Sequence, residues 1–181
     1  MEARILTSLR AAVITVSDSA FRGTREDLSG PAVAKRLGEL GWSVTLHEVV
    51  PDEVSEICEC LVRLAANSSC EAVFTTGGTG IAARDVTPEA TRAVVEREIP
   101  GISELMRSEG LQFTPRSVLS RGIAGILGST LIVNFPGSPR GAVQSLESIA
   151  HLLPHVVDLL KGKTEHEPGE ETTENMRTSV K

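Results

Sequence analysis

Residues 71–80, Glu-Ala-Val-Phe-Thr-Thr-Gly-Gly-Thr-Gly, place a short apolar run directly before a glycine-rich segment. Such a run, ended by turn residues, is typical of a strand that is buried in a parallel sheet. Residues 75–80 comprise three glycines and three threonines, which is more than a tight turn requires. Glycine lets the backbone turn sharply and bring its N–H groups to a ligand. We therefore predict an oxyanion-binding loop, suited to a phosphate or a polar heterocycle.

Apolar strands and amphipathic helices alternate on both sides of this stretch. The predicted strands cover residues 11–16, 42–50, 71–75, 121–126 and 131–135. The predicted helices begin at residues 30 and 87, cover 54–65 and 103–109, and include one long helix at 138–160 that is kinked at Pro154. The segment that joins the last two strands, residues 127–130, is so short that these strands should pair antiparallel. The pattern predicts a three-layer α/β/α sandwich with a mostly parallel sheet and one antiparallel strand.

Polar, acidic or glycine-rich residues follow the predicted strands. In open α/β sheets, ligands bind beyond the carboxyl ends of the strands, so these segments should meet at one edge. They are Ser17-Asp18-Ser19, Pro51-Asp52, the glycine loop with Arg84-Asp85, and Asn134-Phe135-Pro136-Gly137-Ser138-Pro139. Their convergence is stronger evidence for a site than any single motif.

Two aspartates in these segments are candidate metal ligands. Mg²⁺ usually binds one or two carboxylates together with substrate phosphates, which suits Asp52 and Asp85. Asp52 also stands where a helix N-cap belongs, and spacing alone leaves the two roles equal. Asp85 is not needed as a cap, because Thr87 is predicted to cap the next helix. Asp18 fits either a ligand-binding residue or an Asx turn after a strand.

The segment before the last helix has a second potential anion site. Ser138 is the predicted N-cap and Pro139 the first helical residue, so the helix N-terminus would face the same edge of the sheet. Taken alone, this pattern favours good capping and nothing more. A dinucleotide fingerprint at Gly78-x-Gly80-x-x-Ala83 is rejected, because it does not open directly into a helix of a first βα unit.

Composition excludes several classes of protein. The net charge of −6 argues against a non-specific nucleic-acid binder. No apolar run approaches the length of a membrane span. The three cysteines are odd in number and no signal peptide precedes them, which predicts thiols in a reducing, cytoplasmic compartment.

Several segments together resemble the molybdenum-cofactor biosynthesis family, which includes bacterial molybdopterin adenylyltransferase and the G domain of gephyrin. The matching segments are Val16–Asp18, Leu28–Pro31, Val50–Asp52, Thr75–Gly80, Arg84–Ala90, Leu119–Arg121 and Asn134–Gly137. The resemblance runs from about residue 10 to about residue 160. It predicts a single molybdopterin-binding α/β domain at 1–162. Residues 163–181 contain almost no apolar side chains, which predicts a disordered polar tail.

The resemblance also implies a chemistry. Molybdopterin and Mg-ATP would give adenylylated molybdopterin and pyrophosphate on a homotrimer, and the product would pass to a molybdenum-inserting enzyme. Asp52 and Asp85 would take the family's acidic positions near metal and phosphate. The remaining residues that would line or lie near the pocket are Ser17, Asp18, Thr75, Thr76, Gly77, Gly78, Thr79, Gly80, Ser120, Asn134, Pro136, Gly137, Ser138 and Pro139.

Two alternatives stay open at this point. A sister branch of the family has a similar fold and a different role. A non-catalytic trimeric module could bind molybdopterin or hold a partner without turnover. The retention of both Asp52 and Asp85 favours catalysis.

Overall fold

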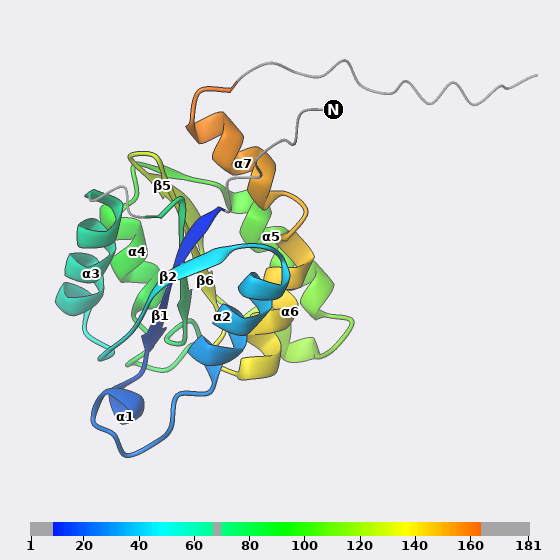
Figure 1. The fold of residues 1–181 in the computed structure, drawn as a ribbon. Coiled ribbons are helices and arrows are strands. Elements are labelled where there is room, and N and C mark those ends of the chain that lie inside the picture. Colours follow the sequence, from blue (N-terminus) through cyan, green and yellow to red (C-terminus); the bar gives the residue numbers. More distant parts are fainter. Residues whose placement is uncertain (1–8, 67–69, 164–181) are drawn as a thin grey trace, which may run out of the picture.

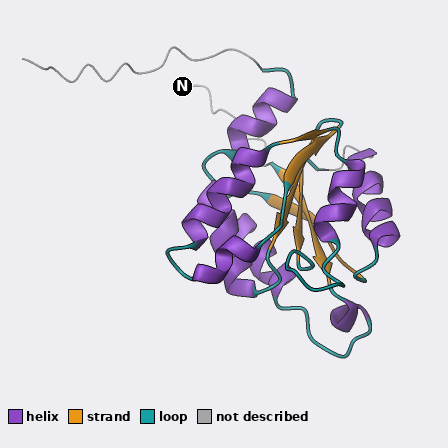
Figure 2. Cartoon of the chain, turned by 180° about the vertical axis from the view of Figure 1, so that it is seen from behind, coloured by secondary structure: helices purple, strands orange, loops and turns teal. Residues whose placement is uncertain are grey.

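A six-stranded mixed sheet forms the centre of the computed structural model, which describes residues 9–66 and 70–163 (Figure 1). The strand order is β2-β1-β3-β6-β5-β4. The strands are β1 (Arg10–Val16), β2 (Ser43–Val50), β3 (Ala72–Thr76), β4 (Arg97–Glu98), β5 (Ala124–Leu127) and β6 (Thr130–Phe135). Strands β2, β1, β3 and β6 are parallel, and β5 pairs antiparallel with both of its neighbours. Helices cover both faces of the sheet, which confirms the predicted sandwich (Figure 2).

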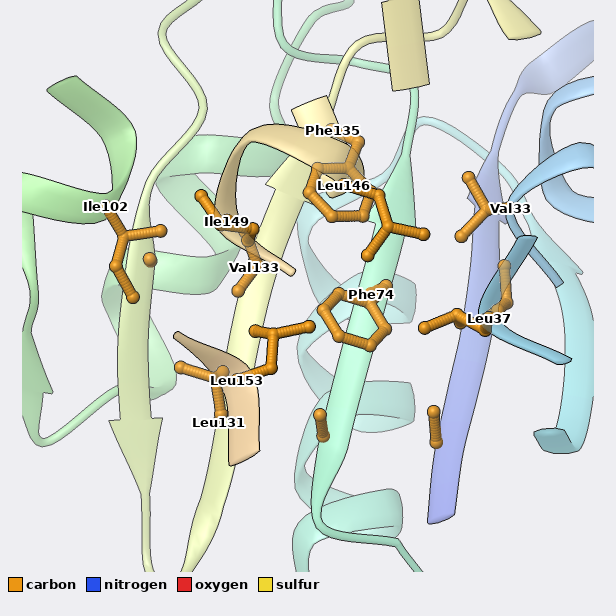
Figure 3. Close-up of a cluster of buried hydrophobic side chains, with 14 of the residues drawn as sticks. Val33, Leu37, Phe74, Ile102, Leu131, Val133, Phe135, Leu146, Ile149 and Leu153 are labelled. Carbon is orange, nitrogen blue, oxygen red and sulfur yellow. The ribbon is translucent and has the colours of Figure 1, made fainter. Parts of the chain in front are cut away.

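One face of the sheet is covered by four helices. They are α2 (Ser29–Glu39), α5 (Pro100–Gly110), α6 (Pro139–Ile149) and α7 (Leu153–Leu160). Phe74 of β3 and Phe135 of β6 stack beneath them, with ring centroids 5.3 Å apart, and the apolar faces of the helices close over both rings (Figure 3). Burying this apolar surface is the main force that holds the helices on the sheet.

The opposite face is covered by α3 (Val54–Ala66) and α4 (Thr87–Val94). Strand β1 serves both faces, because its side chains alternate: Ala11 and Val13 lie in the first core, and Ala12 and Ile14 in the second. This explains why the predicted central strands are continuously apolar. Within the described ranges, no helix has the length and apolar character needed to cross a bilayer.

The predicted long C-terminal helix is wrong. Helix α6 ends at Ile149, and the separate helix α7 begins at Leu153 with Pro154 in its first turn. A proline lacks the N–H that an interior helical position needs, and its ring clashes with the carbonyl four residues earlier. The break therefore falls just before Pro154, where the proline is tolerated as part of a new helix start.

Three short elements were not predicted. They are α1 (Asp18–Phe21), the 3₁₀ helix η1 (Pro115–Leu119) and the two-residue strand β4. Each is too short to show a hydrophobic period. Of the predicted tail at 163–181, only Lys163 is described, where its ammonium pairs with Asp158 at 2.8 Å; residues 164–181 lie outside the described part, and the domain boundary stays a prediction.

Candidate functional site

Two adjoining cavities lie at the carboxyl ends of the parallel strands. The first has a volume of about 570 Å³ and the second about 390 Å³. Both are lined by Gly78, Asp85, Gly137 and Ser138, which therefore form the boundary between them. Two ligands bound in these cavities would meet at this boundary.

The glycine loop has a backbone that only glycine adopts easily. Gly77 and Gly78 have φ angles of +96° and +62°. A Cβ atom on Gly77 would lie 2.3 Å from the carbonyl oxygen of Val16. Among the described residues, the N–H groups of Gly78, Thr79 and Gly80 have no hydrogen-bond acceptor. Three consecutive donors at a cavity wall can accept an anionic ligand.

Thr87 holds this loop in place and is not a helix cap. The N-cap of α4 is Val86, and Thr87 is its first helical residue, so the predicted capping role is wrong. The Thr87 hydroxyl instead donates to the carbonyl of Gly77 at 2.9 Å, and its N–H donates to the carbonyl of Gly78 at 3.1 Å. Both bonds bind the loop to the start of α4, which the local spacing did not indicate.

Asp18 and Asp52 bind each other's backbone. The N–H of Asp18 donates to Asp52 Oδ2 at 2.7 Å, and the N–H of Asp52 donates to Asp18 Oδ1 at 3.1 Å. Arg84 Nη2 donates to the other Asp18 oxygen at 2.8 Å. Among the described residues, no backbone N–H of α3 donates to the Asp52 side chain. Of its two possible roles, Asp52 thus does not act as the cap of α3.

The electrostatics of Asp52 favour a bound cation. Burial raises the pKa of Asp52, and the negative charges of Asp18 and Asp85 raise it further. The hydrogen bond from the Asp18 N–H and the positive charge of Arg84 only partly offset this rise. For Asp18, burial also raises the pKa, but hydrogen bonds from Arg84 and the Asp52 backbone outweigh it and leave the pKa below its ordinary value. A cation beside Asp52 would relieve this repulsion and keep the carboxylate ionised.

Asp85 lies beside Gly80, at the end of the glycine loop. Its Oδ2 accepts from the N–H of Ala82 at 2.8 Å, and a Cβ atom on Gly80 would lie 2.7 Å from that oxygen. A Cβ atom on Gly78 would likewise lie 3.2 Å from Asp52 Oδ1. The Oδ1 atoms of Asp52 and Asp85 have no hydrogen-bond donor among the described residues. The two carboxylates therefore lie beside different glycines of the loop, and both line the second cavity with one oxygen left for a ligand.

These oxygens fit a magnesium ion that is completed by its substrate. In the described part of the chain, no group of three or more His, Cys, Asp or Glu side chains could hold a metal. Mg²⁺ does not require such a cage, since it commonly binds one or two carboxylates and takes its other ligands from phosphates and water. The donor set of Asp52 and Asp85 is of this kind.

The other predicted site residues fall into two groups. Those that line a cavity are Ser17, Gly77, Gly78, Thr79, Gly80, Ser120, Asn134, Pro136, Gly137, Ser138 and Pro139. Asp18, Thr75 and Thr76 line neither cavity. Thr75 and Thr76 are fully buried beneath the loop, where the Thr75 hydroxyl accepts from Asn134 Nδ2 at 3.0 Å. The Thr76 hydroxyl lies 2.9 Å from that of Ser29, so both hydroxyls join β3 to neighbouring elements.

Ser138 is the N-cap of α6, as predicted. Its hydroxyl accepts from the N–H of Gly141 at 3.2 Å, and Pro139 is in the first turn. Because Ser138 lies at the boundary of the two cavities, the positive end of the α6 dipole is directed there. This is a second source of positive potential beside the glycine loop.

Several lining residues were not predicted. Arg107 of α5 and Arg116 of η1 line the first cavity, and Arg25 and Asp27 line the second. No spacing in the sequence relates Arg107 or Arg116 to the glycine loop. Asp27 directly precedes the family motif Leu28–Pro31, and this position could have indicated that it lines the second cavity.

Comparisons with known proteins agree with this geometry. Residues 12–155 match the family model described as "Probable molybdopterin binding domain". The chain is 40% identical to the molybdopterin adenylyltransferase of Helicobacter pylori strain J99, over 87% of this chain and 90% of that protein. It is 38% identical to the Drosophila melanogaster molybdenum cofactor synthesis protein cinnamon, over 86% of this chain and 26% of that one. The crystal structure of the molybdopterin biosynthesis enzyme MoaB from Thermus thermophilus superposes with a TM-score of 0.81 at 47% identity, covering 86% and 98% of the two chains.

Proposed function

The chain belongs to the molybdopterin-binding domain family, and on that premise we propose that it acts in molybdenum-cofactor biosynthesis as a molybdopterin adenylyltransferase. It transfers the AMP of ATP to the terminal phosphate of molybdopterin. The products are adenylylated molybdopterin and pyrophosphate. Relatives that carry this name are 40% identical over 87% and 80% of the chain.

The observation that carries the proposal is the boundary between the two cavities. A phosphate oxygen of molybdopterin forms a bond to the α-phosphorus of ATP, while the bond from that phosphorus to the bridging oxygen of pyrophosphate breaks. Two anions must therefore be brought together, and the protein's task is positioning and charge neutralisation. The free N–H groups at Gly78–Gly80 and the N-terminus of α6 can position the two anions and neutralise part of their charge.

Asp52 and Asp85 are proposed to hold Mg²⁺ through the oxygens that have no donor among the described residues. When bound, the ion neutralises charge on the phosphates of ATP. No side-chain nucleophile is needed. Burial raises the pKa of the Cys60 thiol to about 11, which leaves it protonated and unreactive.

The test is product formation from Mg-ATP and molybdopterin by the wild type and by Asp85→Asn. We expect Asp85→Asn to abolish adenylyl transfer with the fold intact, since Asp85 lies on a loop and the change removes one metal-binding charge. Glu98→Gln is the matched control, because Glu98 pairs with Arg92 away from the cavities and should turn over like the wild type. Unchanged turnover by Asp85→Asn would refute the metal assignment.

The alternative is a non-catalytic trimeric module or a member of the sister branch. Molybdopterin binding by the wild type without any product would support it. We also propose, from the resemblance, a cytoplasmic homotrimer that passes its product to a molybdenum-inserting enzyme. Light scattering should then give a mass of three 19.2 kDa chains, and a mass of one chain would refute the trimer.

A further inference from the structure

Arg121 does not line either cavity, but it binds both ends of the segment 80–85, which we call the Asp85 loop. The guanidinium of Arg121 donates through Nε to the carbonyl of Gly80 at 2.6 Å and through Nη2 to the carbonyl of Asp85. Its Nη1 forms an ion pair with Glu89, in the first turn of α4. The backbone N–H of Arg121 adds a bond to the carbonyl of Thr79 at 2.8 Å. One residue thus holds Thr79, Gly80, Asp85 and Glu89.

The middle of the loop is exposed to solvent. Residues 81–84 are exposed, and Ile81 has 72% of its surface accessible to solvent. Inside the loop, the carboxylate of Asp85 accepts from the N–H of Ala82, and the N–H of Asp85 donates to the carbonyl of Ala82. These two bonds shape the loop but do not connect it to the sheet. The loop is connected to the rest of the fold by Arg121, just before β5, and by the start of α4. Arg84 adds exposed ion pairs to Asp18 and Glu53, each at 2.8 Å.

The planar guanidinium is suited to this task. It presents five donors in a fixed fork, so it can satisfy two carbonyls and a carboxylate at once. The hydrogen bond from Arg121 is the largest cause that lowers the pKa of Glu89, which shows how closely the two groups are paired. Lysine would offer one nitrogen and could not span all three acceptors.

We propose that Arg121 is a positioning residue that sets the Asp85 carboxylate relative to the glycine loop. Arg121 holds the two ends of the loop, Gly80 and Asp85, at a fixed separation. That separation determines the position of the free Asp85 oxygen. The proposal rests on the proposed function for its kinetic consequence only, since the restraint on the loop exists without substrate. Supporting residues of this kind typically contribute roughly 10- to 100-fold in activity or metal affinity.

The experiment compares Arg121→Met with the wild type in two assays. Hydrogen–deuterium exchange of residues 80–86 measures the restraint directly, and steady-state kinetics at varied Mg²⁺ measures its effect. We expect faster exchange at 80–86, a kcat lower by roughly 10- to 100-fold with little change in KM for molybdopterin, and a higher Mg²⁺ concentration for half-maximal rate. Arg92→Met is the control, because Arg92 also pairs with a glutamate, Glu98, but at a distance from the loop.

The outcomes are distinguishable. Unchanged exchange in Arg121→Met would overturn the proposal, as would faster exchange with the kcat and Mg²⁺ dependence of the wild type. If the wild type makes no product, the proposed function fails, while the exchange assay still decides whether Arg121 restrains the loop. If Arg121→Met does not fold, Arg121→Lys replaces it, and an intermediate exchange rate is expected because the pairing with Glu89 can survive.

Discussion

At the scale of single residues, the site depends on backbone shapes that side chains would prevent. Gly77 is the sharpest example, since it combines a positive φ with a carbonyl oxygen in the space that a Cβ atom would occupy. Gly137 is also tightly placed, because its Cβ would lie 3.1 Å from the Cα of Gly77. The loops after β3 and β6 thus lie so close together that the facing residue of each loop is a glycine.

Gly77→Ala should destabilise the fold by about 2 kcal/mol or more, because strain at positive φ costs roughly 1–2 kcal/mol and the contact with Val16 adds to it. Chemical denaturation measures the change. Gly38→Ala is the matched control: Gly38 lies inside α2, and a Cβ there meets nothing within 4 Å. That control should gain roughly 0.5–1 kcal/mol. Equal effects of the two substitutions would contradict the strain argument.

At the scale of secondary-structure elements, the Asp27 carboxylate connects the start of α2 to the sheet. Asp27 Oδ1 accepts from the N–H groups of Ser29 and Gly30, each at 3.0 Å. Its Oδ2 accepts from the Thr15 hydroxyl at 2.6 Å and lies 3.0 Å from Nε2 of His47. Asp27 therefore performs the work of a cap although it precedes the N-cap position, which is Leu28.

Asp27→Ala should cost about 1–2 kcal/mol of stability, since it removes the acceptor of two N–H groups at the start of α2 and a partner of Thr15. Thermal unfolding followed by circular dichroism measures the loss. Glu26→Ala provides the comparison, because this neighbouring side chain makes no hydrogen bond among the described residues. A loss from Glu26→Ala as large as that from Asp27→Ala would refute the capping role.

At the scale of the whole molecule, Glu71 joins the start of β3 to elements from both ends of the described chain. Arg10 of β1 donates to it through its backbone at 2.7 Å and its side chain at 2.9 Å, and Lys161 lies 3.2 Å away. Burial raises the pKa of Glu71, but these hydrogen bonds and the charge of Lys161 outweigh it and lower the pKa to about 2. The folded state thus holds Glu71 ionised more strongly than the unfolded state does.

The sign of the pH dependence follows from this lowered pKa. The contribution of Glu71 is fully present above its ordinary pKa of 4.5 and is lost as the pH falls from there towards 2. At neutral pH, Glu71→Gln should reduce stability by about 1 kcal/mol, and the difference from the wild type should shrink as the pH falls towards 2 and vanish below it. Exposed Glu104→Gln serves as the control. A difference that persists unchanged down to pH 2 would show that the charge is not responsible.

The sequence by itself determined the fold class and the family. Continuous apolar strands and helical periodicity are local patterns, and they predicted the sandwich that the structure confirms. The motifs that resemble the molybdenum-cofactor family are contiguous segments, so they could be recognised without coordinates, and the family match over residues 12–155 agrees with them. The prediction that the segments after the strands meet at one edge of the sheet followed from the topology of parallel sheets.

Only the tertiary structure decided what each side chain does at that edge. Thr87 was predicted to be a cap and instead binds the glycine loop, and Thr75 and Thr76 are buried and line neither cavity. Arg121 binds loop ends that are more than thirty residues away in the sequence. Hydrogen bonds between distant segments compete with local capping and turn preferences, and the partner with the better geometry in the folded state prevails. Since that geometry exists only once the strands are packed side by side, no local pattern in the sequence records it.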